Sequence, residues 1–313
     1  MSRLDELIAQ LCPDGVEYRE LHEVSQITMG TSPNGNTISS DPQNGIEFHQ
    51  GKSCFGNILL GYSNIFTTLP IKVAEAGSIV MSVRAPVGDT NITERKIAIG
   101  RGLCAIAGKS AIETKFIYYC LNAFVNEIKK KSTGSTFDAI NTDDVRSIKI
   151  PIPPLPVQQE IVRMLDTFME LEAELTAELT ARRKQYEYYR DWLLSFNDKE
   201  RYPDGVEYVE LGEVSNVLRG RRLTKSQLSS AGKFPVFHGG LAPLGYYEQY
   251  NRPANTVMVI NVGASAGTVG YSRVDFWSSD GCYCIEQTEL LNSKFLYYLL
   301  IGFQPFLMSR VRV

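Results

Sequence analysis

Two short segments have the residue types of known catalytic or nucleotide-binding motifs. Gly263–Gly267, with the sequence GASAG, has the G-x-S-x-G spacing of a nucleophile elbow and places Ser265 in the nucleophile position. Gly102–Ser110, with the sequence GLCAIAGKS, ends like a phosphate-binding loop. It has one residue too many between its glycines, however, and a phosphate cradle depends on fixed backbone geometry. The second segment is therefore excluded as a nucleotide site.

A serine nucleophile needs a histidine and an acid arranged around it. The chain offers only His22, His49 and His238. The chain contains an internal repeat, described below by its matching segments, and Ala85–Gly88 is the loop of the first copy that corresponds to Gly263–Gly267. This loop carries proline where the serine would be. A loop that accepts proline in one copy is expected to be structural in the other. A serine hydrolase is the least favoured of three hypotheses, and it predicts that a fluorophosphonate probe labels Ser265.

The six cysteines are scattered and include no C-x-x-C pair. A zinc site needs two close ligand pairs, and the only close pair is Cys282 and Cys284. We expect these two residues on a buried strand, as reduced structural thiols. The chain also lacks the Asn/Asp-Pro-Pro-Tyr segment of an adenine methyltransferase and any helicase or nuclease signature. These observations predict a non-catalytic protein without a metal or cofactor of its own.

Basic residues in glycine-rich loops are the candidate contacts for DNA. Loops are where proteins place binding residues, and arginine can hold a phosphate or the edge of guanine. The net charge of −3 does not decide the question, because phosphate binding needs only a local basic face. The alternative for each residue is an ordinary solvated loop charge. The candidates are His49, Lys52, Arg84 and Arg101 in the first half and Arg219, Arg221, Arg222 and His238 in the second.

Length and composition are those of a soluble globular protein with room for two domains. The chain has 313 residues, of which 43% are hydrophobic and 21% charged. No run of about 18 apolar residues is present, so no membrane span is expected. Asp5 and Glu6 stand where a signal peptide would need a basic and then an apolar run. We therefore expect a cytoplasmic protein.

An internal repeat determines the expected architecture. Pro13–Tyr18 (PDGVEY) recurs unchanged as Pro203–Tyr208, 190 residues later. Phe48–Gly51 aligns with Phe237–Gly240 at an offset of 189. Further matches are Leu21, Glu23, Val24, Ser25 and Gly30 with Leu211, Glu213, Val214, Ser215 and Gly220, and Lys115–Tyr119 with Lys294–Tyr298 at an offset of 179. The changing offset predicts shorter loops in the second copy.

A different kind of sequence separates the two copies. The proline-rich run of residues 151–156 cannot be helical, but Val157 to about Phe196 contains neither glycine nor proline. Apolar residues recur in this stretch at spacings of three and four, as in a helix with one apolar face. Forty residues at about 1.5 Å each give a rod of roughly 60 Å. The stripe, a candidate partner-binding surface, is Ile161, Leu165, Phe168, Leu171, Leu175 and Leu179.

This pattern predicts an α+β protein with two tandem β-rich domains separated by a long coiled-coil-like helix. Ser78–Val83 and Thr256–Ile260 are predicted strands, and Phe116–Glu127 is a predicted packing helix. The expected parts are a first domain at residues 1–154, a helical spacer at 155–198 and a second domain at 199–313. The alternative for the spacer is a helix buried in a core, which its many charged residues disfavour.

The chain resembles the specificity subunits of type I restriction-modification systems, which alternate two target-recognition domains with two helical spacers. The resemblance covers essentially the whole chain, and its most specific part is the proline run followed by Gln158–Val162 and the long helix. The other matching segments are Pro13–Tyr18, Ile99–Ala105, Lys115–Tyr119, Gly134–Phe137 with Ile140, and Asp143–Val145.

The resemblance implies a DNA-recognition subunit rather than a catalyst. Each recognition domain would bind one half of a bipartite duplex target, and the spacer would set the distance between the halves. Methyltransferase subunits would dock on the long helix, and restriction subunits would complete the complex; a second copy of the chain is a further candidate partner of the helix. S-adenosylmethionine, ATP and Mg²⁺ are expected on those partner subunits and none of them on this chain.

The sequence departs from the family pattern after Phe303. The second glycine-serine-threonine motif, the second proline run and the second helix do not follow it. This suggests a truncated specificity subunit that cannot assemble normally alone. The second hypothesis is accordingly a silent or decoy specificity protein, which binds the methyltransferase subunit without forming an active enzyme.

Overall fold

The computed structural model describes residues 2–43, 45–131 and 139–311. The chain forms two compact units, residues 1–175 and 176–313, and the boundary between them falls inside the long helix. The sequence-based division at residues 154 and 198, which treats the helix as a separate part, stays a prediction. The predicted Gly134–Phe137 motif lies outside the described residues.

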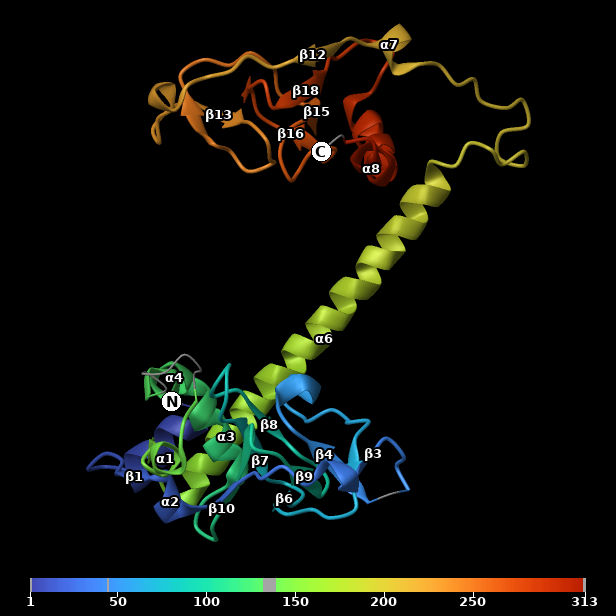
Figure 1. The fold of residues 1–313 in the computed structure, drawn as a ribbon. Coiled ribbons are helices and arrows are strands. Elements are labelled where there is room, and N and C mark those ends of the chain that lie inside the picture. The colour runs from blue at the N-terminus through green and yellow to red at the C-terminus, as the bar shows by residue number, and fades with distance from the viewer. Residues whose placement is uncertain (1, 44, 132–138, 312–313) are drawn as a thin grey trace. The chain divides into compact units, whose positions relative to one another are not determined.

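Unit 1 contains two main sheets and a set of covering helices (Figure 1). The first sheet has the order β2-β10-β7-β8, formed by Ser25–Met29, Leu103–Gly108, Ile79–Ser82 and Thr90–Ile92. The second has the order β3-β5-β4-β9-β6, formed by Ile38–Ser39, Phe66–Thr67, Ile46–His49, Ile97–Ile99 and Val73–Ala74. A separate pair joins β1 (Tyr18–Glu20) to β11 (Lys149–Pro151). The helices are α1 (Arg3–Leu11), α2 (Leu21–Val24), α3 (Thr114–Ala123), α4 (Val125–Lys131) and α5 (Thr142–Arg146).

The core of unit 1 lies on both faces of its central strands. All four residues of β7 are buried, and successive side chains of a strand point to opposite faces. Ile79 and Met81 therefore pack with the helices, including Leu121 of α3, while Val80 packs with Ile99 of the second sheet. This two-sided burial explains why the strand is a continuous apolar run rather than an alternating one.

Unit 2 repeats the strand order of unit 1 with different residues. Its first sheet is β12-β18-β15-β16, formed by Val217–Arg219, Cys282–Ile285, Thr256–Ile260 and Val269–Ser272. Its second sheet is β14-β13-β17, formed by Gly245–Tyr247, Phe234–Phe237 and Trp277–Ser278. The helices are α7 (Leu211–Val214) and α8 (Ser293–Ser309). Because β12, β18, β15 and β16 take the places of β2, β10, β7 and β8, the duplication predicted from the sequence is confirmed.

The P-loop-like segment and the segment that resembles a nucleophile elbow lie in ordinary strands and turns. The P-loop-like segment falls mostly in β10, a buried strand. Gly263–Gly267 connects β15 and β16, which pair antiparallel, so it is a hairpin loop and not the strand-to-helix turn of a nucleophile elbow. Cys282 and Cys284 lie on β18, fully buried as predicted, and burial raises the pKa of Cys282 to about 12. No cluster of possible metal ligands occurs among the described residues.

The single helix predicted for residues 116–127 is divided into two helices in the structure. We expected one helix over residues 116–127, and α3 ends at Ala123 before α4 begins at Val125. The backbone of Phe124, with φ −98° and ψ 12°, leaves the helical region at this point. Predicted strands at residues 78–83 and 256–260 correspond to β7 and β15.

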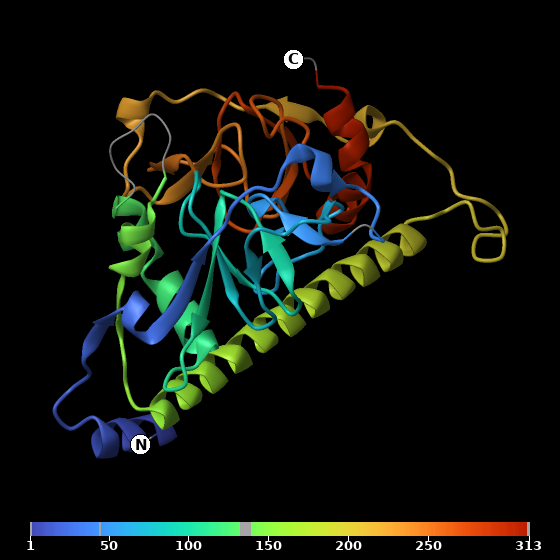
Figure 2. The same ribbon diagram turned by 60° about the horizontal axis from the view of Figure 1, so that its bottom comes forward.

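The long helix α6 runs from Leu155 to Leu193 and has 39 residues. It is continuous in both views of the molecule (Figures 1 and 2). Pro156 lies in its first turn, where the missing N–H costs nothing, so the helix begins two residues earlier than predicted. Val157 and Val162 are buried against unit 1, whereas residues 171–189 are exposed. A helix buried along its whole length is thus excluded. Among the described residues no helix is long and apolar enough to cross a membrane.

Candidate nucleic-acid interface

Four strands of unit 1 end at the same place, and the loops that follow them form one cluster. The backbone connects these loops directly: Thr31 N–H donates to Ile99 O at 3.0 Å, and Gly100 N–H donates to His49 O at 2.7 Å. Val83 N–H donates to Gly102 O at 2.9 Å, which attaches the loop after β7. The ends of β2, β4, β7 and β9 are therefore held together by main-chain hydrogen bonds. We call the residues at these ends (30–32, 50–54, 83–89 and 100–102) loop cluster 1.

Glycines allow the backbones of loop cluster 1 to approach closely. A Cβ atom on Gly30 would lie 2.1 Å from Gly100 O, and one on Gly102 would lie 2.5 Å from Gln50 O. Both distances are far below van der Waals contact, and each involves backbone that cannot rotate away. Gly30 and Gly102 are therefore required by packing, which fixes the position of the side chains between them.

Three of the four predicted contacts in unit 1 are exposed on this cluster. Arg84 and Arg101 are exposed, and Arg101 Nε lies 3.4 Å from Ser32 Oγ. Lys52 forms an ion pair with Asp89. The cluster thus carries three basic residues and one acid, so its charge is positive although the chain as a whole is negative. Such a local excess is what phosphate binding requires.

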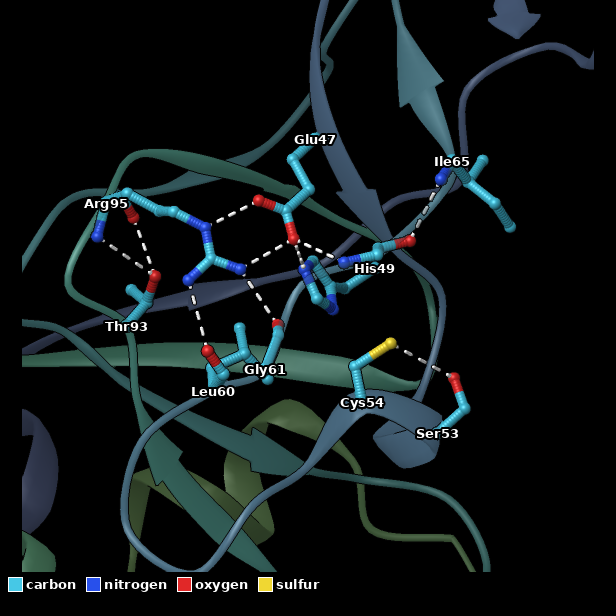
Figure 3. A network of polar contacts seen from close by, with 10 residues as sticks. Glu47, His49, Ser53, Cys54, Leu60, Gly61, Ile65, Thr93 and Arg95 are labelled. Carbon is cyan, nitrogen blue, oxygen red and sulfur yellow. Dashed lines mark hydrogen bonds and ion pairs between the residues drawn. The ribbon is translucent and has the colours of Figure 1, made fainter. Parts of the chain in front are cut away.

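His49, the fourth predicted contact, is buried below the cluster and belongs to a polar network. Figure 3 shows Glu47 between Arg95 and His49. His49 Nε2 lies 2.8 Å from Glu47 Oε1, and the Arg95 guanidinium holds both carboxylate oxygens, with Nη2 at 2.6 Å from Oε1. Ser63 N–H also donates to Glu47 Oε1. Since only 2% of His49 is exposed, its side chain is not part of the exposed surface of loop cluster 1.

The network controls the charge of its members. Burial alone would raise the pKa of Glu47, but hydrogen bonds from Arg95, Ser63 and His49 outweigh it and lower the pKa to about 2. Burial lowers the pKa of His49, although Glu47 opposes that shift. Glu47 is therefore a carboxylate over the whole physiological range, and Arg95 neutralises it. This arrangement is structural, because each charge is directed at another residue of the network.

Unit 2 forms an equivalent loop cluster. Gly220 N–H donates to Cys282 O at 3.1 Å, and Arg221 N–H donates to Ser278 O at 2.8 Å. Arg219, Arg221 and Arg222 are exposed, and Arg219 Nε lies 3.5 Å from Asp280 O. Loop cluster 2 consists of residues 220–222, 238–241, 261–268 and 279–281 together with Arg219, the last residue of β12; with Arg219 included it also contains three basic residues and one acid. The three predicted arginines are brought together.

Gly220→Ala is expected to displace the arginine loop of unit 2. A Cβ at this position would lie 2.0 Å from Ser279 O and 2.4 Å from Ser278 O, so the backbone must move. We expect a loss of about 2 kcal/mol in the stability of unit 2, within the range of overpacking substitutions. Tryptophan fluorescence during urea unfolding measures it, since both tryptophans, Trp192 and Trp277, lie in unit 2. Gly212→Ala, with no atom within 4 Å of its Cβ, is the control, and an equal effect of the two would contradict the packing argument.

The structure shifts one part of the sequence alignment by one residue. In the parallel pair β4–β9, His49 lies opposite Ile99, and in β13–β17 Phe237 lies opposite Ser278. Ile99 and Ser278 are equivalent, because each accepts the N–H of the residue after the conserved glycine, Thr31 or Arg221. His49 therefore corresponds to Phe237. The sequence alignment had paired His49 with His238, and that pairing is wrong.

The corrected register places Gln50 and His238 at equivalent positions. A shift of one residue moves a side chain to the other face of a strand, so the two predicted histidines have different environments. His238 is 35% exposed in loop cluster 2, and its Nδ1 lies 3.3 Å from Asp280 Oδ1. Gln50 is exposed in loop cluster 1 and accepts from Ser32 Oγ at 2.8 Å. Sequence reasoning missed Gln50 and Asp280, although both lie beside the glycine positions that mark the clusters.

The polar network of unit 1 has no counterpart in unit 2. With the corrected register, Pro235 takes the place of Glu47. Val274 takes the place of Arg95. In unit 1 the Thr93 hydroxyl accepts the N–H of Arg95 and donates to the Arg95 carbonyl, and in unit 2 the Ser272 hydroxyl makes the same two hydrogen bonds with Val274. The loop clusters are conserved between the halves, while the interior beneath them differs.

Comparison with known proteins decides the family. The model of the type I restriction modification DNA specificity domain matches residues 13–181 and again residues 203–311. The first match contains the first copy of the repeat and part of the long helix, the second match contains the second copy, and together they cover most of the chain. The protein belongs to this family.

Individual relatives of this specificity-domain protein agree with the assignment. It is 39% identical over 164 residues to the MjaX protein of Methanocaldococcus jannaschii, assigned as a type I restriction enzyme specificity subunit, covering 51% of this chain and 38% of the relative. It is 29% identical over 248 residues to the EcoprrI specificity subunit of Escherichia coli, covering 73% of this chain and 61% of the relative. The chain thus spans less than two thirds of either relative.

A solved structure shows the same fold. The type I restriction-modification system S subunit from M. genitalium superposes with a TM-score of 0.66 at 19% identity, covering 95% of this chain and 79% of that structure. The α+β class, with two recognition domains and a long helix, is thereby confirmed. The comparison concerns fold alone, since so low an identity does not transfer individual contacts.

The predicted partner stripe of this specificity-domain protein is exposed along most of its length. Ile161 and Leu165, at the start of the stripe, are half-buried. Further along α6, four large apolar side chains have exposed fractions between 47% and 66%, and their spacing of three and four residues puts them on one face. They are Phe168, Leu171, Leu175 and Leu179. An apolar row of this kind on a helix is unusual for a surface that faces only water.

Proposed function

We propose that this chain recognises a bipartite duplex DNA target, with loop cluster 1 and loop cluster 2 each binding one half. The observation that carries the proposal is the recurrence of the same cluster in both units. Each consists of strand ends joined through close-packed glycines, with three basic residues and one acid. Arginine and lysine supply the phosphate contacts that orient a protein on DNA, and rigidly held side chains can then discriminate base edges.

The two clusters are expected to prefer different half-sites. Arg101 in loop cluster 1 and Asp280 in loop cluster 2 occupy equivalent positions, at an offset of 179, and carry opposite charges. Arginine pairs with the O6 and N7 atoms of guanine, while a carboxylate accepts from the N4 amine of cytosine. Gln50 and His238 differ at the neighbouring position. The charge reversal therefore supports an asymmetric target.

The exposed stripe on α6 supports a second role, the docking of methyltransferase subunits. In this proposal the catalytic work of modification and cleavage belongs to methyltransferase and restriction subunits. S-adenosylmethionine, ATP and Mg²⁺ are bound there, and this chain supplies recognition and positioning without a cofactor of its own. The mixed charge of the helix and its apolar row suit a helical partner surface better than DNA.

Selection from a randomised duplex library, with the chain assembled with its methyltransferase subunit, tests DNA recognition. We expect one enriched bipartite sequence. On that sequence, fluorescence anisotropy is expected to show that Arg221→Ala/Arg222→Ala weakens binding by at least tenfold and lowers the salt slope of log K by about 1.8, if each arginine contacts one phosphate. Arg183→Ala/Lys184→Ala on exposed α6 removes the same charge and is the control.

Two results would count against the proposal. Equal weakening by the control pair would show that only net charge matters. Failure to enrich any sequence, although the methyltransferase subunit binds, would leave the decoy role as the better account.

A further inference from the structure

A pocket in unit 2 lies beside the outer edge of β16. It has a volume of about 780 Å³ and is formed by β13, by β14 and by residues 271–275, which end β16 and follow it. All of its lining residues belong to unit 2, and none belongs to loop cluster 2. Its apolar lining includes Phe234, Pro235, Phe237, Pro243, Tyr246 and Val274.

Unit 1 has a longer loop at the equivalent place. The offset between equivalent residues is 188 at Gln50 and His238 but 180 at Phe66 and Tyr246, which pair with equivalent residues of β4 and β13. Unit 2 is therefore eight residues shorter between these points, as the changing offset predicts. The missing residues correspond to part of the stretch 51–64 of unit 1.

In unit 1 this stretch includes an extended segment along β8. Ile92 N–H donates to Ile58 O at 2.8 Å, and Leu60 N–H donates to Ile92 O at 2.9 Å. The Arg95 guanidinium donates to the carbonyls of Leu60 and Gly61 (Figure 3). Leu60 is 3% exposed and packs in the core with side chains of the second sheet. Residues 58–61 thus bind the strand edge through their backbone and fill the space beneath it with an apolar side chain.

The pocket of unit 2 is the space that this segment fills in unit 1. Val274, which takes the place of Arg95, lines the pocket. Tyr271 also lines it and is equivalent to Ile92 at the same offset of 179. Two positions that hold residues 58–61 in unit 1 therefore face an open pocket in unit 2.

The backbone of Tyr271 is available to a partner. β16 is the outermost strand of its sheet, and no residue in the described part of the chain pairs with its outer side. Ile260 N–H donates to Thr268 O, and hydrogen-bonded pairs recur at every second residue of an antiparallel ladder. Tyr271, three residues after Thr268, lies between such pairs, so its N–H and C=O point away from β15. An edge of this kind accepts an added strand.

The rim of the pocket carries an excess of positive charge. Lys233 and Arg273 both line it and are exposed. Asp275 is the one acid of the lining, and its carboxylate accepts a hydrogen bond from Ala254 N–H at 2.7 Å. In unit 1 the place of Arg273 is taken by Glu94, at the offset of 179. The positive rim is thus a property of unit 2, and it favours an occupant with an acidic residue.

Leu241 limits the length of the occupant. A Cβ atom on Gly270 would lie 2.4 Å from Leu241 Cδ2, so Leu241 occupies the space beside this residue. The equivalent of Gly270 in unit 1 is Asn91, whose side chain accepts from Gly56 N–H at 2.8 Å and donates to Gly56 O at 3.2 Å. The counterpart of Gly56 is therefore excluded, and the open part of the pocket starts at Tyr271.

We infer that this pocket binds an extended apolar segment of a partner protein, the counterpart of residues 58–63, which ends in an acidic residue. The segment adds a parallel strand to β16 at Tyr271, places an apolar side chain where Leu60 lies in unit 1, and directs its acid at Arg273. The inference rests on the internal repeat and on the contacts of unit 1. It does not depend on DNA recognition, because the pocket and loop cluster 2 share no residue.

A labelled peptide, Ile-Leu-Leu-Gly-Glu-Ser, tests the inference on the full chain. It has the sequence of residues 58–63 with Tyr62→Glu, because Tyr62 is 81% exposed in unit 1 and lies over the Arg95 guanidinium. We expect saturable binding at one site, followed by fluorescence anisotropy. Arg273→Glu is expected to weaken binding at least threefold, and a peptide with lysine in place of glutamate is expected to prefer that variant. Lys225→Glu, an exposed lysine outside the pocket, is the matched control.

Methylation of peptide nitrogens tests the added strand directly. N-methylation of the third residue, the counterpart of Leu60, removes the N–H expected to donate to Tyr271 O and is expected to weaken binding about fivefold. N-methylation of the second residue is the control, because Leu59 N–H forms no hydrogen bond with β8 in unit 1. Equal effects of the two methylations would show that the peptide does not pair with β16 and would overturn the inference.

An exchange of loops gives an independent check. Replacing residues 239–243 by residues 51–63 gives unit 2 the loop of unit 1, which is expected to fill the pocket and to weaken peptide binding at least tenfold. The control keeps residues 239–243 and adds eight glycine and serine residues, and we expect it to bind the peptide as the unchanged chain does. Circular dichroism and Trp277 fluorescence establish that each variant is folded.

Three further results would contradict the inference. The first is the absence of saturable binding up to the solubility limit of the peptide. The second is an equal loss of binding in the loop exchange and in its glycine-serine control. The third is self-association of the chain that the loop exchange abolishes while the peptide does not bind, since the occupant would then be a second copy of the chain.

Discussion

Arg95→Ala is expected to lower the free energy of unfolding of unit 1 by about 3 kcal/mol. The guanidinium holds both oxygens of Glu47, donates to Leu60 O at 3.1 Å and Gly61 O at 2.8 Å, and lies over the ring of Tyr62. Its removal leaves a carboxylate that is 9% exposed without a counter-charge. Removing one partner of a buried pair costs several kcal/mol because the other charge remains desolvated.

Hydrogen exchange of β4 and β9 is the measurement for unit 1, since the chain has two units and a single global transition is not expected. Both tryptophans lie in unit 2, so their fluorescence shows whether the effect stays in unit 1. Lys96→Ala is the control: its ion pair with Glu75 is exposed at both ends, and we expect a change of less than about 0.5 kcal/mol. Equal effects of the two substitutions would contradict a structural role for the network.

Acid pH is expected to reduce the difference in the free energy of unfolding of unit 1 between Arg95→Ala and the unchanged chain. Glu47 has a folded pKa of about 2, below its ordinary value of 4.5. A depressed carboxyl pKa contributes stability that is present above the unfolded pKa and is lost as pH falls through the folded pKa. The contribution is about 3 kcal/mol at neutral pH and less than half of that at pH 3. A difference that stays constant from pH 7 to pH 3 would show that Arg95 acts through packing alone.

Leu171→Ser/Leu175→Ser is expected to weaken docking of the methyltransferase subunit by a factor of about 100 or more. Both side chains are exposed in this chain, at 47% and 66%, and burial of a leucine contributes about 1.5–3 kcal/mol. Loss of the burial free energy of both leucines is expected to weaken binding more than loss of any single loop arginine weakens DNA binding. Isothermal titration calorimetry with the purified methyltransferase subunit measures the change.

Ala173→Ser/Ala177→Ser is the matched control for the leucine pair. These residues are exposed on the opposite face of α6, and serine lowers helix propensity by a similar amount in both variants. If the control weakens docking equally, loss of helix stability explains the result. If neither pair has an effect, the stripe is not the docking surface; sedimentation then shows whether it joins two copies of the chain instead.

The repeat made much of the fold predictable. Identity between Pro13–Tyr18 and Pro203–Tyr208 implied two copies of one domain, and the equivalent strand orders follow from it. The absence of glycine and proline between residues 157 and 196 similarly implied α6, with an error of two or three residues at each end. These features depend on neighbours in sequence, or on a comparison of the chain with itself.

The interior of unit 1 could not be predicted in the same way. Glu47 and Arg95 are 48 positions apart, and nothing local marks them as partners. Phe-His occurs at residues 48–49 and again at 237–238, and this identity suggested that His49 and His238 are equivalent. The strand register instead makes His49 equivalent to Phe237. Only pairing with β9 and β17 reveals that His49 faces the interior and His238 the loop cluster. Register between distant strands is set by tertiary contacts, which a single sequence does not contain.

The difference between the interiors of the two units has a consequence for folding. Tandem copies of one fold can exchange equivalent strands during folding, since each strand finds two sites of similar shape. Here β4 brings Glu47, which needs Arg95, and the equivalent place in unit 2 offers Val274. A β4 strand inserted into unit 2 would bury a carboxylate without a cation, at a cost of several kcal/mol. We therefore expect the Glu47–Arg95 ion pair to disfavour insertion of β4 into the second sheet of unit 2.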